Sequence, residues 1–210
     1  IKFFFILWVN YITLAHSKSN HISDSSYDEN KRWPDGLSPF GFKVVEEMNK
    51  QGVMIDISHV SDAAFMKVLE LSRAPVVATH SSLRHFTPGW ERNVSDEMLI
   101  ALAENGGVIQ LCFGSDFVAN RKDNPDLEVS VKNVVDHIDR VRDLVGIDHV
   151  GFGSDFDGEV PLPDDINDVS KFPNLIEELL IRGYSESEID KILNGNILRV
   201  WKEVRSLADA

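Results

Sequence analysis

Four polar side chains that could do chemistry stand at the ends of short apolar runs in this sequence. Three of the runs end in histidine and one in aspartate, at His16, His59, His80 and Asp155. When parallel strands alternate with helices, the residues that follow successive strands meet at one edge of the sheet. Imidazoles and a carboxylate that meet there can bind a metal ion and move protons. The pattern therefore predicts a metal-assisted hydrolase.

The metal-binding interpretation depends on His59 and His80, which occupy equivalent points of neighbouring predicted strands. Two imidazoles alone hold zinc weakly, because catalytic zinc sites usually have three protein ligands. The alternative is that both histidines cap helices or bond to backbone carbonyls. Asp155 favours the metal site, because an acid beside an activated water can take its proton and pass it to a leaving amine.

Two further residues have chemistry that suits a hydrolase. His16 could be a metal ligand or a donor to a developing oxyanion. Arg92, in the predicted loop after His80, could recognise a carboxylate through its bidentate fork, or it could be a solvated surface arginine. The other histidines have weaker claims: His21 and His85 in predicted loops, His137 on a predicted helix away from this edge, and His149 before a strand.

The elements that must position these residues alternate along the chain. Strands are predicted at 11–15, 53–57, 76–79, 108–113 and 150–153. Helices are predicted at 39–51, 62–72, 96–104, 129–145, 173–182 and 197–204, with Ser185 and Glu188 forming a capping box. A polar, turn-rich loop is predicted at 17–37.

The strand cores are rich in Val and Ile and mostly do not alternate with polar residues, which is typical of a parallel sheet covered on both faces. A doubly wound sheet and a barrel both fit this α/β pattern. Polar residues at successive strand ends favour the barrel, although five strands are too few to close one.

Composition narrows the classes of partner. The 210 residues carry a net charge of −13 at pH 7, which argues against nucleic acid, since phosphate binding needs clustered Lys and Arg. The single cysteine, Cys112, excludes an internal disulfide framework and is expected to be a buried core thiol.

The N-terminal residues allow two interpretations. Lys2 and the apolar run 3–9 are typical of a secretory leader, with 13–15 as a poor cleavage site. The run is too short to span a bilayer, and no initiating Met precedes it. The alternative, a helix end that leads into the first strand, is the one we expect. With it we expect a soluble protein without a membrane span, cytoplasmic rather than exported.

Several segments resemble the membrane (renal-type) dipeptidases, metallopeptidase family M19. The most specific are the Asp-x-Ser-His segment that ends at His59 and Gly-Phe-Gly-Ser-Asp-Phe-Asp-Gly at 151–158. Gly-Leu-Ser-Pro-Phe-Gly at 36–41 and Arg-Asn-Val at 92–94 are also similar. The resemblance runs over nearly the whole chain in the family's order.

The resemblance implies a (β/α)8 barrel of the metal-dependent amidohydrolase type, of which this chain would form roughly strands 4–8. Residues 1–210 would be a single incomplete domain, with the long loop at 17–37 and C-terminal helices at 171–210. The family binds two zinc ions bridged by a carboxylate and a hydroxide, and hydrolyses dipeptides. His59 and His80 would be ligands of the second zinc.

The resemblance also implies roles toward the dipeptide substrate. His16 would contact the substrate and steady the tetrahedral intermediate, so that it is both a catalytic and a substrate-binding residue. Arg92 would hold the terminal carboxylate, with Asn93 nearby. Asp155 would be the catalytic acid/base that shuttles the proton.

The chain departs from the family pattern before His16. The His-x-Asp pair for the first zinc and the bridging glutamate have no counterpart there. We therefore expect an N-terminally truncated member that by itself binds the second zinc weakly and the first not at all.

Three alternatives for function and assembly stay open at this point. The chain could be another metal-dependent amidohydrolase acting on a lactone, an ester or a cyclic amide. It could also be a non-catalytic scaffold derived from the barrel. A homodimer is a further expectation from the family.

Overall fold

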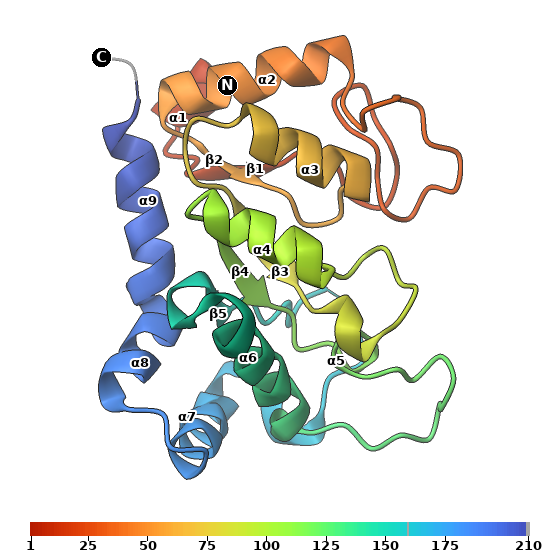
Figure 1. Cartoon of the computed structure of the whole chain (residues 1–210), viewed down its shortest axis with the longest axis vertical. Helices are drawn as coiled ribbons and strands as arrows, with labels where there is room; N and C mark the ends of the chain where they lie inside the picture. The colour runs from red at the N-terminus through yellow and green to blue at the C-terminus, as the bar shows by residue number, and fades with distance from the viewer. Residues whose placement is uncertain (159, 209–210) are drawn as a thin grey trace.

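Five parallel strands form the centre of the protein, in a computed structural model that describes residues 1–158 and 160–208. They are β1 (Tyr11–Thr13), β2 (Met54–Asp56), β3 (Val77–Ser81), β4 (Val108–Leu111) and β5 (Val150–Phe152), and each pairs with the next in chain order (Figure 1). A doubly wound sheet reverses its strand order at a switch point, whereas a barrel does not. The described strands are therefore an arc of a (β/α)8 barrel, as predicted.

Helices cover the sheet and connect its strands. Along one side, α2 (Pro39–Gln51), α3 (Asp62–Leu71), α4 (Asp96–Glu104) and α6 (Val131–Val145) pack successively against one another. The C-terminal region holds α7 (Phe172–Ile181), α8 (Glu186–Asp190), a π-helical turn (Lys191–Gly195) and α9 (Asn196–Ser206). Shorter helices are α1 (Lys2–Ile6), α5 (Ser115–Val118) and the 3-10 turns η1 to η4 (Arg84–Phe86, Ile147–His149, Asp164–Ile166, Val169–Lys171).

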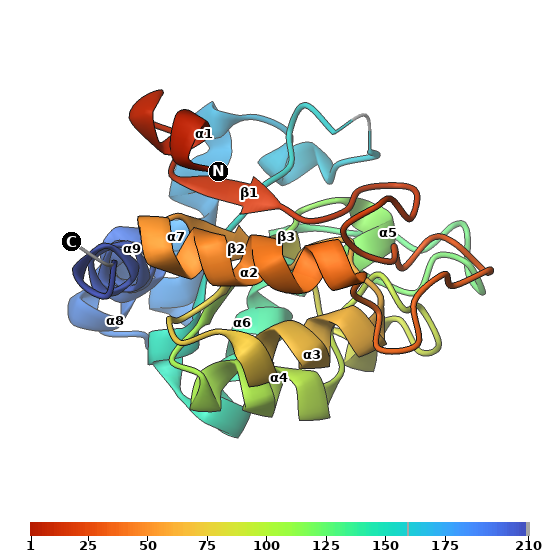
Figure 2. The same ribbon diagram turned by 90° about the horizontal axis from the view of Figure 1, so that it is seen from above.

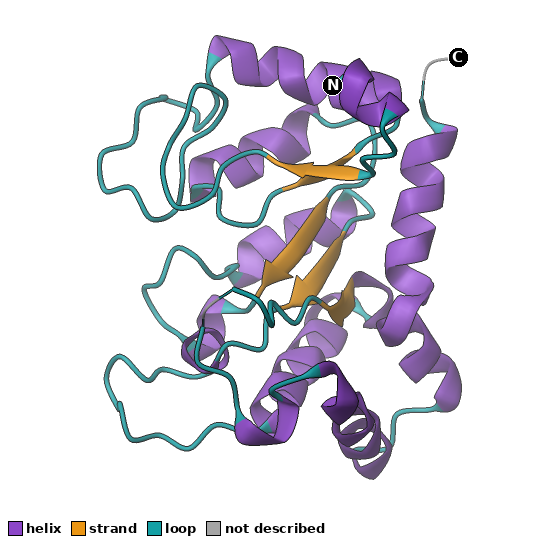
Figure 3. Cartoon of the chain, turned by 180° about the vertical axis from the view of Figure 1, so that it is seen from behind, coloured by secondary structure: helices purple, strands orange, loops and turns teal. Residues whose placement is uncertain are grey.

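The two faces of the sheet pack against different partners, because successive side chains of a strand point to opposite faces. One face contributes to the main core with the row of helices: Ile55, Ala78 and Ile109. On the other face, the first residues of β2, β3 and β4 pack against α9 in a smaller cluster: Met54, Val77, Val108, Val200 and Val204. Helix α9 therefore closes the N-terminal end of the sheet, and the long loops project from the opposite end (Figures 2 and 3).

Local sequence signals set the helix ends. Ser38, Ser61 and Ser95 each accept a hydrogen bond from the backbone N–H three residues ahead, at the starts of α2, α3 and α4. Gly52 ends α2 in the left-handed conformation, with φ of 69°. The capping box predicted at Ser185 is confirmed at the start of α8.

Several boundaries differ from the prediction. Strand β3 continues to Ser81, so that His80 lies inside the strand and does not follow it. Helix α6 begins at Val131 and not at 129, because Ser130 caps it and donates its backbone N–H to the Asn133 amide oxygen at 3.0 Å. The short α5 and the π-helical turn were not predicted, since neither has enough residues to show a period.

The first elements expose apolar side chains. α1 precedes β1, as the helix-to-strand alternative predicts, and β1 pairs among the described residues with β2 alone. Exposed side chains here include Phe3, Ile6 and Trp8. Among the described residues, the structure contains no helix with the length and apolar character needed to traverse a bilayer.

His137 is an internal crosslink between α6 and two loops. Its imidazole is fully buried, and the Leu83 backbone N–H donates to Nδ1 at 3.0 Å while Nε2 donates to the Val118 carbonyl at 3.1 Å. Leu83 follows β3 and Val118 follows β4, so both lie at the end of the sheet where the site residues were predicted. The side chain of His137 therefore reaches that end, although its position on a helix predicted that it would lie away from it. Burial lowers the pKa of His137 to about 4.

The depressed pKa predicts a pH-dependent stability. In the unfolded chain the same imidazole titrates near 6.5, so it binds a proton more readily unfolded than folded. The stabilisation is therefore complete above about pH 6.5 and is lost as the pH falls toward about 4, by roughly 3 kcal/mol. We expect His137→Gln to lower the free energy of unfolding at neutral pH and to flatten its decrease between about pH 7 and about pH 5.

Urea unfolding at these two pH values measures the effect. The matched control is His21→Gln, because His21 is exposed and stacks on Phe40 at a centroid distance of 5.4 Å. A decrease of equal size in His137→Gln and in the unchanged chain would contradict the assignment.

Candidate metal and substrate site

Four of the predicted site residues line one cavity at the end of the sheet opposite α9, and the other two, Arg92 and Asn93, lie outside its lining. The cavity has a volume of about 370 Å³, within the range of small-molecule sites. It is lined by His16, Ser17, Tyr27, His59, His80, Phe117, Asp155, Gly158 and Val160. His16, His59, His80 and Asp155 thus share one cavity, although the last lies 139 positions after the first in the sequence.

The three histidines form a row across the cavity. The Nε2 atoms of His59 and His80 are 2.7 Å apart, and the two ring centroids are 4.8 Å apart. The ring of His16 lies beside that of His59 at 4.3 Å. His16 is exposed and its Nδ1 contacts the Ser17 hydroxyl at 2.7 Å, so it stands at the mouth while the other two form the floor.

Both floor imidazoles are held neutral. Burial and then the positive charge of Arg92 lower the pKa of His59 to about 2, and the same two causes lower the pKa of His80. Metal ions bind neutral imidazole, so this environment keeps the nitrogen lone pairs available at neutral pH.

Arg92 is buried beneath these rings, which excludes the solvated alternative. Its Nη1 donates to the Ser81 hydroxyl at 2.9 Å, and its Nη2 donates to the His80 carbonyl at 2.5 Å and contacts His59 Nε2 at 3.3 Å. The guanidinium lies 5.2 Å from the centroid of the Phe117 ring. Burial lowers the pKa of Arg92, and its Nε has no hydrogen-bond partner within the described chain.

Arg84 fixes the loop that carries Arg92. It binds Asp62 through both carboxylate oxygens, at 2.7 and 2.6 Å. The same guanidinium donates to the Glu91 carbonyl at 3.1 Å and to the Asn93 carbonyl at 2.9 Å, on the two sides of Arg92. Sequence reasoning did not single out Arg84, because its partners are fixed by loop packing and follow no local pattern.

Asn93 lies behind Arg92 and outside the cavity lining. Its side chain is fully buried, and Nδ2 donates to the Thr87 hydroxyl at 2.7 Å and to the Phe117 carbonyl at 2.8 Å. Its Oδ1 accepts from the Ser82 backbone N–H at 3.3 Å. These bonds give Asn93 a structural role, and a contact with substrate stays a prediction.

His59 and Asp155 share an unusual backbone conformation. Both have positive φ, 69° and 67°, which places a non-glycine residue in the left-handed region at a cost of about 1–3 kcal/mol. Each stands three residues beyond its strand, β2 and β5 respectively. The turn redirects each side chain into the cavity, so strain is accepted where a functional side chain needs a particular aim.

The Asp155 carboxylate has close neighbours of two kinds. Cys112 is buried, as predicted, and its thiol donates to Asp155 Oδ2 at 3.8 Å. Burial raises the pKa of this thiol to about 12, so it stays a protonated donor. A Cβ atom on Gly158 would lie 2.5 Å from Asp155 Oδ1, so glycine there leaves room for the carboxylate.

Two aromatic residues of the cavity escaped the sequence analysis. Tyr27 comes from the long loop after β1, and its ring centroid lies 5.9 Å from that of His59. Burial raises the pKa of its hydroxyl, so the phenol stays neutral. Phe117 belongs to the unpredicted α5. An aromatic residue in the polar 17–37 segment was the available signal for Tyr27, and none pointed to Phe117.

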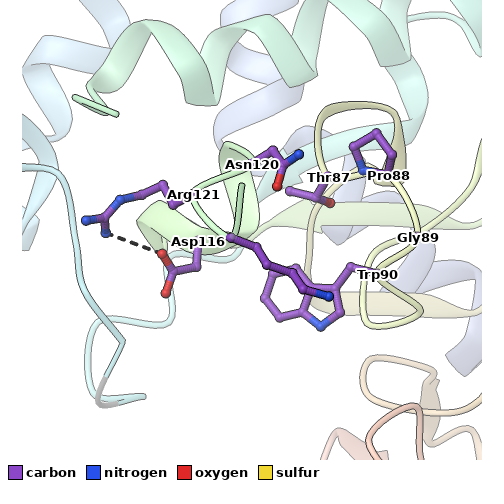
Figure 4. A pocket seen from close by; sticks show the side chains of 8 residues that line it. Thr87, Pro88, Gly89, Trp90, Asp116, Asn120 and Arg121 are labelled. Atoms are coloured by element: carbon purple, nitrogen blue, oxygen red, sulfur yellow. Dashed lines mark hydrogen bonds and ion pairs between the residues drawn. The ribbon is translucent and has the colours of Figure 1, made fainter. Parts of the chain in front are cut away.

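A second cavity lies beyond the aromatic wall. Its volume is about 380 Å³, and its lining includes Trp90, Asp116 and Arg121 (Figure 4). The Trp90 ring packs on Phe117 at a centroid distance of 4.7 Å, so the two residues separate the cavities. The ion pair of Arg121 with Asp116, at 3.3 Å, is largely exposed and contributes little stability.

The donor set fits part of a zinc site. His59 and His80 converge through neutral nitrogens, and their Nε2 atoms would have to move apart slightly for both to bind one zinc ion at about 2.0–2.1 Å. No cluster of three or more His, Cys, Asp or Glu donors occurs among the residues that the structure describes. The floor of the cavity therefore brings two imidazole donors together, whereas catalytic zinc sites usually have three protein ligands.

The burial of Asn93 predicts a large effect on stability. Asn93→Ala would leave the Ser82 N–H, the Thr87 hydroxyl and the Phe117 carbonyl without their partner, so we expect a loss of about 2–4 kcal/mol. Urea unfolding measures it. The control Asn120→Ala removes an exposed amide that bonds to Asp123, and it should change stability by less than about 0.5 kcal/mol. Equal effects of the two variants would contradict the structural role.

Comparison with known proteins identifies the family of the chain. The sequence profile described as "Membrane dipeptidase (Peptidase family M19)" matches residues 1–210. Dipeptidase tcpJ of Claviceps purpurea (strain 20.1) is 41% identical over 208 residues, which are 99% of this chain and 48% of that protein. Dipeptidase 3 of Homo sapiens is 37% identical over 212 residues, 100% of this chain and 42% of that protein. The chain thus spans less than half the length of these curated relatives.

Solved structures share the fold. The probable dipeptidase PvdM from Pseudomonas aeruginosa matches with a TM-score of 0.86 and 31% identity over 97% of this chain and 66% of that chain. A metallo peptidase from Rhodobacter sphaeroides, liganded with a phosphinate mimic of the dipeptide L-Ala-D-Ala, matches with a TM-score of 0.87 and 31% identity over 97% of this chain and 58% of that chain. Since the family profile covers every residue and the fold agrees, the chain belongs to the membrane dipeptidases of peptidase family M19.

Proposed function

We propose that this protein is a zinc-dependent dipeptidase and that His59 and His80 hold one zinc ion. The observation that carries the proposal is the convergence of two neutral imidazole nitrogens, 2.7 Å apart, on the floor of a cavity that also contains Asp155. When bound, zinc supplies Lewis acidity toward a water molecule and the peptide carbonyl.

The chain's own residues supply the other functions that dipeptide hydrolysis needs. Asp155 is the proton shuttle: its carboxylate reaches the cavity, and the Cys112 thiol steadies one of its oxygens. His16, exposed at the mouth, is placed to contact the substrate and to donate to a developing oxyanion. The cavity volume of about 370 Å³ suits a small substrate such as a dipeptide.

Arg92 is the proposed anchor for the substrate carboxylate. Its guanidinium lies next to His59, and its buried Nε–H has no partner among the described residues. An unsatisfied charged donor at this depth is costly, and an incoming carboxylate would satisfy it. This feature favours a dipeptide with a free carboxyl end over a neutral ester or lactone.

The number of protein ligands limits how tightly this chain would bind zinc. We propose that it binds about one zinc ion per chain, and weakly, because a third protein ligand is not among the described donors.

Zinc titration tests the ligand assignment. We expect His59→Ala and His80→Ala each to weaken zinc binding by more than about tenfold, because each removes one of two ligands. Isothermal titration calorimetry of the metal-free chain measures the affinity and the stoichiometry. His85→Ala is the matched control, since His85 is exposed in a neighbouring loop. Tight binding of two zinc ions, or equal losses in all three variants, would overturn the assignment.

Substrate chemistry tests the anchor. In the presence of zinc we expect a Gly-Xaa dipeptide to bind at least about tenfold more tightly than its C-terminal amide, because only the carboxylate can form a charge-assisted pair with Arg92. Arg92→Met should abolish that preference. Ligand-detected NMR and product analysis of both peptides provide the measurement. If the amide is bound or cleaved as well as the dipeptide, the protein would be another kind of amidohydrolase. If the chain binds zinc but neither peptide, it would be a non-catalytic scaffold.

A further inference from the structure

A buried carboxylate joins three strands beneath the candidate site. Asp56, the last residue of β2, is fully buried. Its Oδ1 accepts from the backbone N–H groups of Ser58, at 2.9 Å, and Thr79, at 3.0 Å. Its Oδ2 accepts from the hydroxyls of Thr13, at 2.6 Å, and Thr79, at 2.7 Å. These four bonds occupy the lone pairs of the carboxylate.

The bond from Thr79 decides the protonation of the neighbouring imidazole. A threonine hydroxyl has a single hydrogen, and that of Thr79 is given to Asp56, which as a carboxylate can only accept. In its second contact, at 2.7 Å from His80 Nδ1, the Thr79 oxygen must therefore act as the acceptor. The hydrogen of that contact belongs to the imidazole, so the neutral ring of His80 carries its proton on Nδ1.

This tautomer points a lone pair into the cavity. With Nδ1 protonated, Nε2 of His80 is an acceptor, and it faces His59 Nε2 at 2.7 Å. A contact of this length is a hydrogen bond, so in the metal-free chain its hydrogen comes from His59 Nε2. A metal ion bound at this point would replace that hydrogen and accept the lone pair of His80 Nε2. The opposite tautomer of His80 would direct an N–H bond to the same point and could not bind a metal there.

We propose that Asp56 and Thr79 are positioning residues that fix His80 in the Nδ1–H tautomer and so keep Nε2 available as a ligand. The ligand part of this inference rests on the proposed function, whereas the tautomer part depends only on the hydrogen bonds. Neither residue lines the cavity. Outer partners of this kind orient a metal-binding histidine and raise its basicity.

The tautomer can be measured directly. In the metal-free, ¹⁵N-histidine-labelled chain, long-range ¹H–¹⁵N correlation NMR distinguishes a protonated ring nitrogen from an unprotonated one. We expect Nδ1 of His80 to be protonated in the unchanged chain and in Thr79→Ser, which keeps the hydroxyl. In Thr79→Val we expect the two tautomers to mix. An Nε2–H tautomer in the unchanged chain would overturn the proposal without recourse to any variant.

Thr13→Val is the matched control for a general loss of stability. It removes a hydroxyl bond to the same Asp56 oxygen, but Thr13 has no hydrogen bond to His80 among the contacts described. We expect it to lower the melting temperature as Thr79→Val does and to leave the His80 tautomer unchanged. A tautomer shift of equal size in both valine variants would show that loosening of the sheet, and not the relay through Thr79, sets the tautomer.

Zinc affinity separates this inference from the proposed function. We expect Thr79→Val to weaken zinc binding by about 10- to 100-fold and Thr79→Ser to restore it. If the unchanged chain binds no zinc but shows the Nδ1–H tautomer, the proposed metal site fails and the positioning role of Asp56 and Thr79 stands. If Thr79→Val changes neither the tautomer nor the affinity, the positioning role fails and the metal site stands.

Discussion

The site depends on a buried carboxylate that must be fully hydrogen-bonded to be tolerated. Burial of an unpaired polar group costs several kcal/mol, so Asp56 restricts the arrangement of everything that bonds to it. Its partners come from β1, from the turn after β2 and from β3. A shift in any of these segments would leave part of the carboxylate unsatisfied. The chemistry of one side chain thus sets the relative positions of three strand ends at the floor of the cavity.

Buried polar contacts also fix the loops that surround the cavity. Arg92 is buried between two histidines, and its neighbours on both sides are fixed by Arg84, which is itself held by Asp62. Asn93 extends this support to the loop after β4 through the Phe117 carbonyl. The loop that carries Arg92 is therefore held from behind by polar residues that do not line the cavity. Such support is what keeps a site within the narrow tolerances that catalysis requires.

The sequence pattern predicted the strands and the shared edge of the sheet well, because strand ends in a parallel sheet meet by topology alone. His59 and His80 could be paired in this way, and the serine caps of α2 and α8 could be read locally. The clamp at Arg84 could not be found, since it joins residues that no periodicity relates. The positive φ of His59 could not be predicted either. It arises because the loop turns sharply to direct the ring into the cavity, and a histidine in a sequence does not indicate positive φ as a glycine would. His137 was misplaced for a related reason, because a helix position does not say how far a side chain reaches.

Cys112 gives the site an internal reporter. It is the single thiol of the chain, it is buried beneath Asp155, and its high pKa leaves almost no thiolate at neutral pH. A thiol-reactive probe would therefore modify the folded protein only when the floor of the cavity opens. The labelling rate would follow the local opening equilibrium of this part of the sheet, separately from global unfolding. A bound metal ion or substrate that holds the floor closed would then lower the labelling rate of Cys112, although neither ligand touches its sulfur atom.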